Sequence, residues 1–199
     1  DLTGTIDLAA TLDPRLRHVF LVGGADSNDR SLQGIAELQL RRFEPALEIT
    51  YWLGLRTSDL EDRLRRMPPH SMVFYLVVGQ DGAGQFFHPL QYLERVAAAA
   101  NAPVYTWVDS AMGLGVVGGS LKSQTAQMQV VADTALRVLR GEPPDTIPVS
   151  FRNLNVRQVD WRQLQRWGFS QARVPAGTVI LFRDPTAWQR YRSYILAAV

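Results

Sequence analysis

The chain has 199 residues, 46% of them hydrophobic and 20% charged, so it can bury a substantial core and is not a disordered chain. This length favours one domain or a domain with an appendage. The net charge of +2 is too small to indicate a nucleic-acid partner. Cysteine is absent, which excludes disulfides, thiol nucleophiles and thiolate zinc sites.

The N-terminal segments predict one helix and then a strand–helix unit. Leu2–Leu12 is expected to begin as a short extended piece and to continue as a small amphipathic helix. His18–Gly23 is an unbroken apolar run that ends at the glycine pair Gly23-Gly24, which is typical of a strand covered on both faces. N-cap residues follow, and an apolar stripe then carries a helix as far as Arg42.

The strand–helix alternation continues as far as Val108. The predicted strands are Leu47–Leu53, Met72–Val78 and Pro103–Val108. The predicted helices are Asp59–Arg66, with a Ser58–Glu61 capping box, and Pro89–Ala100, with Asn101 as its C-terminal cap. Such alternation predicts an α/β fold with a doubly wound, mainly parallel sheet.

The sequence after Gly119 reads differently, and we interpret residues 120–199 as a C-terminal α/β extension of a ligand-binding lobe formed by residues 1–119. Ser123–Leu139 is a longer helix, and Asp160 caps a short helix that Gly168 stops. Strands are expected at Thr146–Phe151 and Thr178–Arg183, followed by a final helix that starts at Asp184-Pro185.

A candidate ligand site lies in Pro103–Gly119, where a strand ends on Trp107 and Asp109 and opens into a glycine-spaced turn containing Met112. The carboxyl edge of a parallel sheet is where open α/β folds bind ligands. We therefore expect a small-molecule site built around Asp109, with the indole of Trp107 beside it.

Two further loops should reach the same edge. The cluster Asp26, Ser27, Asn28, Asp29 and Arg30 is explained most simply as a helix cap, but Arg30 or the free helix amides could meet an anionic ligand group. Gln80, Phe86 and Phe87 lie in a glycine-containing loop. The two aromatic side chains could cover the core or form an apolar wall for a flat ligand.

Other chemistries have weaker signals. Gly113, Gly115 and Gly118 match GxGxxG with Asp133 downstream, but the last glycines lie in a strand-like run, so turn formation is favoured over nucleotide binding. The three histidines have no metal-binding spacing, and no GxSxG elbow is present. We expect no cofactor, no metal and no catalysis, with a nucleotide-dependent or hydrolytic enzyme as the alternative, because a Ser-His-Asp triad assembled in space remains open.

The C-terminal third carries a resemblance. DWRQLQRWG at Asp160–Gly168 and FRDPTAWQRYR at Phe182–Arg192 resemble the end of the extracytoplasmic sensor regions of bacterial membrane histidine kinases. Those regions are similar to the periplasmic substrate-binding components of ABC importers. The resemblance extends upstream through Leu136–Pro144, Pro103–Gly119 and Val22–Arg30.

The resemblance implies a two-lobed, periplasmic binding domain with a small aromatic or carboxylated ligand in the cleft. Asp109, Trp107 and the two loops would line one side, and another lobe would precede Asp1. A transmembrane helix and a kinase would follow Val199, and Tyr191–Leu196 suits a membrane approach. The helix Ser123–Leu139 would lack its packing partner in the first lobe or would pack against another chain. The second alternative leaves open that the protein forms a homodimer. A free ABC-importer component is the runner-up.

Overall fold

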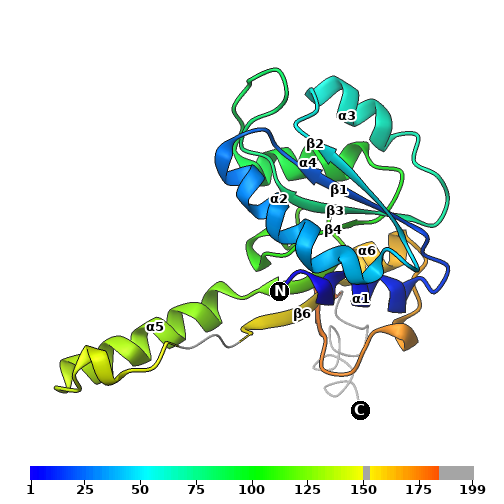
Figure 1. Ribbon diagram of the computed structural model, residues 1–199. Coiled ribbons are helices and arrows are strands. Elements are labelled where there is room, and N and C mark those ends of the chain that lie inside the picture. The colour runs from blue at the N-terminus through cyan, green and yellow to red at the C-terminus, as the bar shows by residue number, and fades with distance from the viewer. Residues whose placement is uncertain (150–152, 184–199) are drawn as a thin grey trace, which may run out of the picture.

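The computed structural model describes residues 1–149 and 153–183. Its centre is a seven-stranded sheet in the order β2-β1-β3-β4-β5-β6-β7 (Figure 1). Strands β1 to β5 run parallel, β6 is antiparallel to β5, and β7 is parallel to β6. The predicted α/β class with a doubly wound, mainly parallel sheet is confirmed.

The elements are short and regular. The strands are His18–Gly23 (β1), Glu48–Leu53 (β2), Ser71–Val77 (β3), Val104–Tyr105 (β4), Gly118–Lys122 (β5), Asn155–Asp160 (β6) and Val179–Leu181 (β7). The α-helices are Thr3–Leu12 (α1), Ser27–Leu40 (α2), Thr57–Leu64 (α3), Pro89–Ala99 (α4), Gln124–Leu139 (α5) and Trp161–Arg166 (α6).

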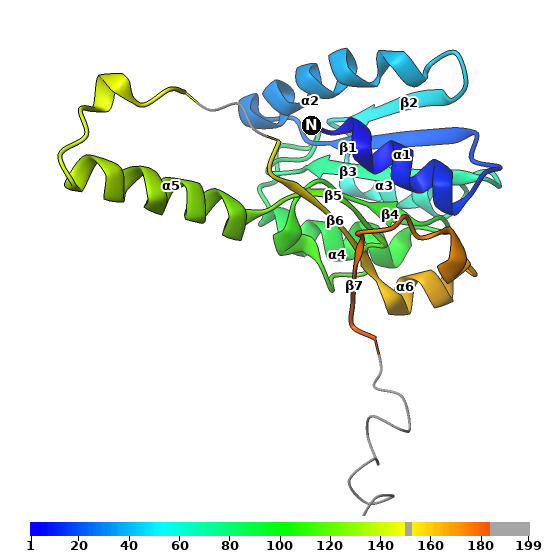
Figure 2. The same cartoon turned by 90° about the horizontal axis from the view of Figure 1, so that it is seen from below.

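Helices cover both faces of the sheet, as Figure 2 shows. One apolar cluster joins the sheet to α3 and α4 and includes Val73, Leu64 and Leu93. The other joins the opposite face to α1, α2 and α6 and includes Ile6 and Leu164. Because β1 and β3 are buried on both faces, they consist of the unbroken apolar runs that the sequence shows.

The direction of winding changes between β1 and β3. The chain moves from β1 to one neighbour, β2, and then returns past β1 to place β3 on its other side. Open α/β sheets bind ligands at such a switch point, outside the carboxyl ends of the strands. The loops after β1 and β3 are therefore the ones that the topology brings to this position.

Helix α5 projects away from the body of the protein (Figures 1 and 2). None of its residues is buried, although its sequence is rich in apolar side chains. Met128, Val131 and Leu139 are 62%, 60% and 81% exposed. With Ala135 and Val138 they follow the 3–4 spacing that places side chains on one helix face. The described chain thus leaves one apolar face of α5 uncovered.

The N-terminal helix differs from the expectation. No extended piece precedes it, because α1 already begins at Thr3. Gly4 lies within this helix, where a Cβ atom would stand only 2.8 Å from the Cβ of Ser120. Gly4 therefore allows α1 to pack closely on β5. From the sequence alone, this role cannot be distinguished from that of a glycine that interrupts a helix.

Two predicted caps are wrong. Helix α3 begins at Thr57, and no side chain caps it. The Thr57 hydroxyl donates to Asp81 instead, and Glu61 of the predicted capping box forms an ion pair with Arg95. Helix α4 ends at Ala99, and its C-cap residue is Ala100 rather than Asn101. The amide of Asn101 instead exchanges two hydrogen bonds with the backbone of Met67, at 3.1 and 3.3 Å. Glu61 and Asn101, which were predicted to cap helices, thus contact residues distant in the sequence.

The strands near the end of the chain also differ. The fourth strand is only Val104–Tyr105, although Val108 later forms a bridge with Lys122. No strand occupies residues 146–149, where a 3₁₀ turn at Pro144–Thr146 precedes irregular chain, and residues 150–152 of that prediction lie outside the described part. Instead, Asn155–Asp160 forms β6, whose polar sequence gives little strand signal. The predicted helix from Pro185 also lies outside the described residues.

Candidate functional site

The loops after β1 and β3 are joined at the switch point by a buried carboxylate. Asp29 is 2% exposed and accepts the backbone N–H groups of Gly79, at 3.0 Å, and Gln80, at 3.4 Å. Burial raises the pKa of Asp29, while the hydrogen bonds from the two backbone amides oppose that rise. This predicted ligand residue is therefore directed inward, where it connects α2 to the loop after β3.

The rest of the Asp26–Arg30 loop forms the start of α2. The carboxylate of Asp26 accepts the backbone N–H groups of Asn28, at 2.7 Å, and Asp29, at 2.9 Å. Arg30 donates from Nε to the carbonyl of Ala25 at 3.0 Å, and its side chain is exposed. Ser27 and Asn28 are exposed as well. This end of the loop offers polar groups to solvent, whereas the Asp26 carboxylate already has two donors.

The loop after β3 is held in shape by a second buried carboxylate. Asp81 accepts from the Thr57 hydroxyl at 2.6 Å and from the backbone N–H groups of Ala83 and Gln85, at 2.9 and 3.0 Å. Burial raises the pKa of Asp81, but these hydrogen bonds outweigh burial and hold it below its ordinary value. Asp81 is not among the site residues that the sequence predicts.

The aromatic residues of that loop have different environments. Phe86 is 73% exposed beside Gln80, to which its backbone is bridged. Phe87 is half-buried, and its ring centre lies 4.7 Å from that of Tyr92. Of the two, only Phe86 presents most of its side chain to solvent, and Phe87 packs against the core.

The residues after β4 lead towards β5 and α5. Trp107 donates from Nε1 to the carbonyl of Leu76 at 2.7 Å, which fixes the orientation of its indole. Asp109 accepts the backbone N–H of Gln124 at 2.9 Å, so its carboxylate helps to cap the start of α5. Met112 is half-buried against the apolar cluster next to α3 and α4.

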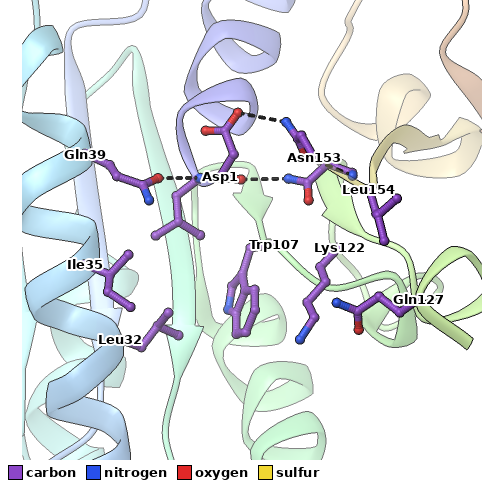
Figure 3. A pocket seen from close by; sticks show the side chains of 11 residues that line it. Asp1, Leu32, Ile35, Gln39, Trp107, Lys122, Gln127, Asn153 and Leu154 are labelled. Carbon is purple, nitrogen blue, oxygen red and sulfur yellow. Dashed lines mark hydrogen bonds between the residues drawn. The ribbon is translucent and has the colours of Figure 1, made fainter. Parts of the chain in front are cut away.

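A cavity of about 430 Å³ lies between α2, Trp107 and the start of α5 (Figure 3). Trp107 is the one predicted site residue among its lining residues. The others are Asp1, Leu2, Leu32, Ile35, Gln39, Lys122, Gln127, Asn153, Leu154 and Asn155. Its volume falls within the range of small-molecule pockets, roughly 300–1,000 Å³. We refer to it as the Trp107 pocket.

The residues of the Trp107 pocket come from five separate segments, so sequence spacing could not assemble them. The helix pattern assigned Leu32 and Ile35 to the buried stripe of α2, but Ile35 is 48% exposed. One signal was available: Lys122 is the only lysine in the chain, where the other 20 basic residues are arginine.

The structure also shows where the possible metal ligands and the glycines of the GxGxxG match lie. No cluster of three His, Asp or Glu residues that could hold a metal ion occurs within residues 1–149 and 153–183. The GxGxxG segment ends at Gly118, which opens β5 rather than a helix, and Gly113 and Gly115 adopt positive φ angles of 92° and 89°. These glycines form the turns between β4 and β5. Across the described ranges, no helix has the length and hydropathy needed to cross a membrane.

Fold and site together define a doubly wound α/β domain with polar loops at its topological switch point and a separate pocket between α2, Trp107 and the start of α5. The sequence matches no protein-family model and no curated protein. Solved structures with a similar fold include a substrate-binding protein with adhesive properties from Clostridium difficile, in a ligand-free, open form. It is 11% identical with a TM-score of 0.69, over 92% of this chain and 60% of that one.

Two further structures share the fold. One is the ABC domain from Streptococcus pneumoniae in complex with L-Trp, 14% identical with a TM-score of 0.61, over 88% of this chain and 59% of that chain. The other is a conserved domain protein from Vibrio cholerae, which is 17% identical with a TM-score of 0.59. The match covers 88% of this chain and 58% of that chain. The present chain spans about three fifths of each of these structures. At these identities the likeness establishes a periplasmic-binding-protein-like fold.

Proposed function

We propose that this chain is one lobe of a two-lobed, noncatalytic receptor for a small molecule. The observation that carries the proposal is the switch point between β1 and β3, where the loops containing Asn28, Arg30 and Phe86 present exposed side chains. The similar fold of a substrate-binding protein and of an ABC domain with bound L-Trp supports it. By analogy, the ligand is aromatic or carboxylated.

The proposal assigns residues 1–119 to the ligand-binding lobe and residues 120–199 to segments that return towards a first lobe. The uncovered apolar face of α5 supports this division, because a face formed by Met128, Val131 and Leu139 is stabilised when another apolar surface covers it. The neighbours' additional two fifths of chain offer room for such a lobe. Ligand binding would close the two lobes through a hinge.

We further propose that the full-length protein is the extracytoplasmic sensor of a membrane histidine kinase, tethered through a segment after Val199. The resemblance at Asp160–Gly168 and Phe182–Arg192 supports this assignment. A free ABC-importer component is the alternative. A membrane-spanning segment and a kinase encoded after Val199 would support the sensor, and a protein that ends without them would favour the importer.

Ligand binding is tested by thermal shift with aromatic acids, amino acids and nucleotides. Stabilisation by an aromatic or carboxylated compound, with a dose dependence that follows mass action, is the expected result. A shift produced by nucleotides alone and abolished by Gly115→Ala would instead favour the enzyme alternative. Gly115 has a positive φ angle, so the unliganded stability of that variant must be compared first.

The two-lobed arrangement is tested with single cysteines, because the chain has none of its own. Met128→Cys lies on the apolar face of α5, and Gln129→Cys lies on its polar face as the matched control. Both should react with a maleimide in the 199-residue chain. In the full-length protein, Cys at 128 should be protected and Cys at 129 should stay reactive. Equal reactivity at both positions would contradict the lobe contact.

A further inference from the structure

The Trp107 pocket contains the ammonium group of Lys122, which has no carboxylate partner in the part of the chain that the structure describes. Lys122 is half-buried, and no acidic group within the described ranges lies within ion-pair distance of it. Its backbone N–H donates to the carbonyl of Trp107 at 2.7 Å. Its Nζ lies 6.0 Å from the centre of the Trp107 ring, at the limit of a cation–π contact. Within residues 1–149 and 153–183, no acidic side chain offsets this positive charge.

Asp1, the one acid among the described lining residues, points away from this ammonium. Asp1 accepts the backbone N–H and the hydroxyl of Thr3 at one carboxylate oxygen, at 3.0 and 2.7 Å, and the amide of Asn153 at the other, at 3.2 Å. Figure 3 shows the Asp1 carboxylate at the far end of the pocket from the Nζ of Lys122. The lysine end of the pocket is consequently electropositive.

An anionic group at Lys122 would find a second donor. The side chain of Gln127 extends towards Lys122 in Figure 3. No hydrogen bond of its side-chain amide is found among the described residues. Gln39 accepts the backbone N–H of Leu2 through Oε1 at 2.8 Å and lies on the α2 side of the pocket, across from Lys122 (Figure 3). The ammonium and the side-chain amide of Gln127 can therefore both donate to a carboxylate at this end of the pocket.

One wall of the pocket is apolar. The indole of Trp107 is fixed by its bond to Leu76, and Leu2, Leu32 and Ile35 supply aliphatic surface. A rigid wall reduces the ordering cost of binding. Such a surface opposite the Lys122 ammonium matches a ligand with one anionic end and an apolar body.

We propose that the Trp107 pocket binds small carboxylates with an apolar body, with Lys122 as the counter-charge and Trp107, Leu32 and Ile35 as the wall. This inference rests on the proposed small-molecule function and names the ligand class and the residues that select it. It also places the ligand beside α2 and β5, displaced from the loops at the switch point.

Isothermal titration with phenylacetate, indole-3-acetate and hexanoate tests the proposal, each compared with its uncharged amide. At least one carboxylate should bind about tenfold or more tightly than its amide, because its charge meets a partly desolvated ammonium. Lys122→Met keeps the aliphatic stem and should remove that preference. Lys122→Arg keeps the charge and should retain most of it.

A matched pair on α2 tests the location. Ile35→Glu places an acid in the pocket and should abolish carboxylate binding, whereas Leu38→Glu, at a 70% exposed position outside the pocket, should leave it unchanged. Both positions are exposed, so neither change should disturb folding, and far-ultraviolet circular dichroism checks this.

The outcomes separate this inference from the proposed function. Carboxylate binding that is equal in the unmodified protein and Lys122→Met overturns the inference. If Arg30→Met abolishes binding instead, the ligand lies at the switch point and the proposed function stands. If all three carboxylates fail while another compound of the thermal-shift panel binds, only the inference is overturned. If no compound of either set binds, both fail.

Discussion

The carboxylate of Asp29 accepts the backbone N–H of Gly79 at 3.0 Å across a separation of fifty residues. This bond joins the first turn of α2 to the end of β3 at the switch point of the sheet. Hydrogen bonds to a charged group are among the stronger ones in proteins, so the two loops should behave as one unit. Side chains carried by these loops are therefore held on a fixed support.

Gly24→Ala should destabilise the protein. A Cβ atom at Gly24 would overlap the Asp29 carboxylate and would lie 2.7 Å from the carbonyl oxygen of Gln80. We expect a loss of about 1–3 kcal/mol in the free energy of unfolding, as for other overpacked sites. Urea denaturation at neutral pH measures it.

Gly34→Ala is the matched control for Gly24→Ala. Gly34 lies within α2, and a Cβ atom there would meet nothing within 4 Å. Alanine should stabilise the helix by about 0.5–1 kcal/mol. Equal effects of the two substitutions would contradict the close contact described at Gly24.

Asp29 should make the protein less stable as the pH rises. Burial raises its pKa in the folded state, so between the unfolded pKa and this raised value the folded state binds more protons. The free energy of unfolding should therefore decrease with pH across that window. Asp29→Asn removes this titration, and urea denaturation from pH 3 to pH 7 should show that the variant lacks the decrease.

Asp81 should have the opposite dependence. Burial acts to raise its pKa, but the hydrogen bonds from Thr57, Gln85 and Ala83 hold the folded value below the unfolded one. Its stabilisation is present above the unfolded pKa and is lost as the pH falls through the folded pKa. Asp81→Asn should cost about 1–3 kcal/mol at pH 7. This difference should shrink below about pH 4, and a difference independent of pH would argue against the proposed linkage.

Asp160→Ala should weaken the junction of β6 and α6. The fully buried carboxylate accepts the backbone N–H of Arg162 at 2.9 Å and pairs with its guanidinium at 2.7 Å. Because that guanidinium is half-exposed, its charge keeps contact with water. The expected cost is therefore about 1–2 kcal/mol, close to that of a lost helix cap.

Ser123→Ala provides the comparison for Asp160→Ala. Ser123 caps α5 by accepting the backbone N–H of Ala126 at 3.3 Å. Helix α5 has no buried residue, so fraying at its start should reduce the global stability by less, about 0.5–1 kcal/mol. A larger loss for Ser123→Ala than for Asp160→Ala, measured by thermal unfolding, would contradict this ranking.

The regular elements were predictable where local patterns are strong. His18–Gly23 forms β1 over the predicted range, and the helix Ser123–Leu139 was placed to within one residue. Both depend on an apolar run or on helical periodicity, which neighbouring residues determine. By contrast, β6 has the sequence NVRQVD and forms a strand because it pairs with β5, a contact that no local pattern encodes.

The sequence by itself determined the α/β class and the position of polar loops after the parallel strands, because strand and helix periods are local properties of the chain. Only the tertiary structure decided how those loops are used. Strand order turns Asp29 inward to Gly79 and leaves Arg30 exposed. It also brings Lys122 beside Trp107, since their backbones pair across the ends of neighbouring strands. Contacts between residues that are distant in the sequence depend on the strand order, and the spacing of residues along the chain does not determine that order.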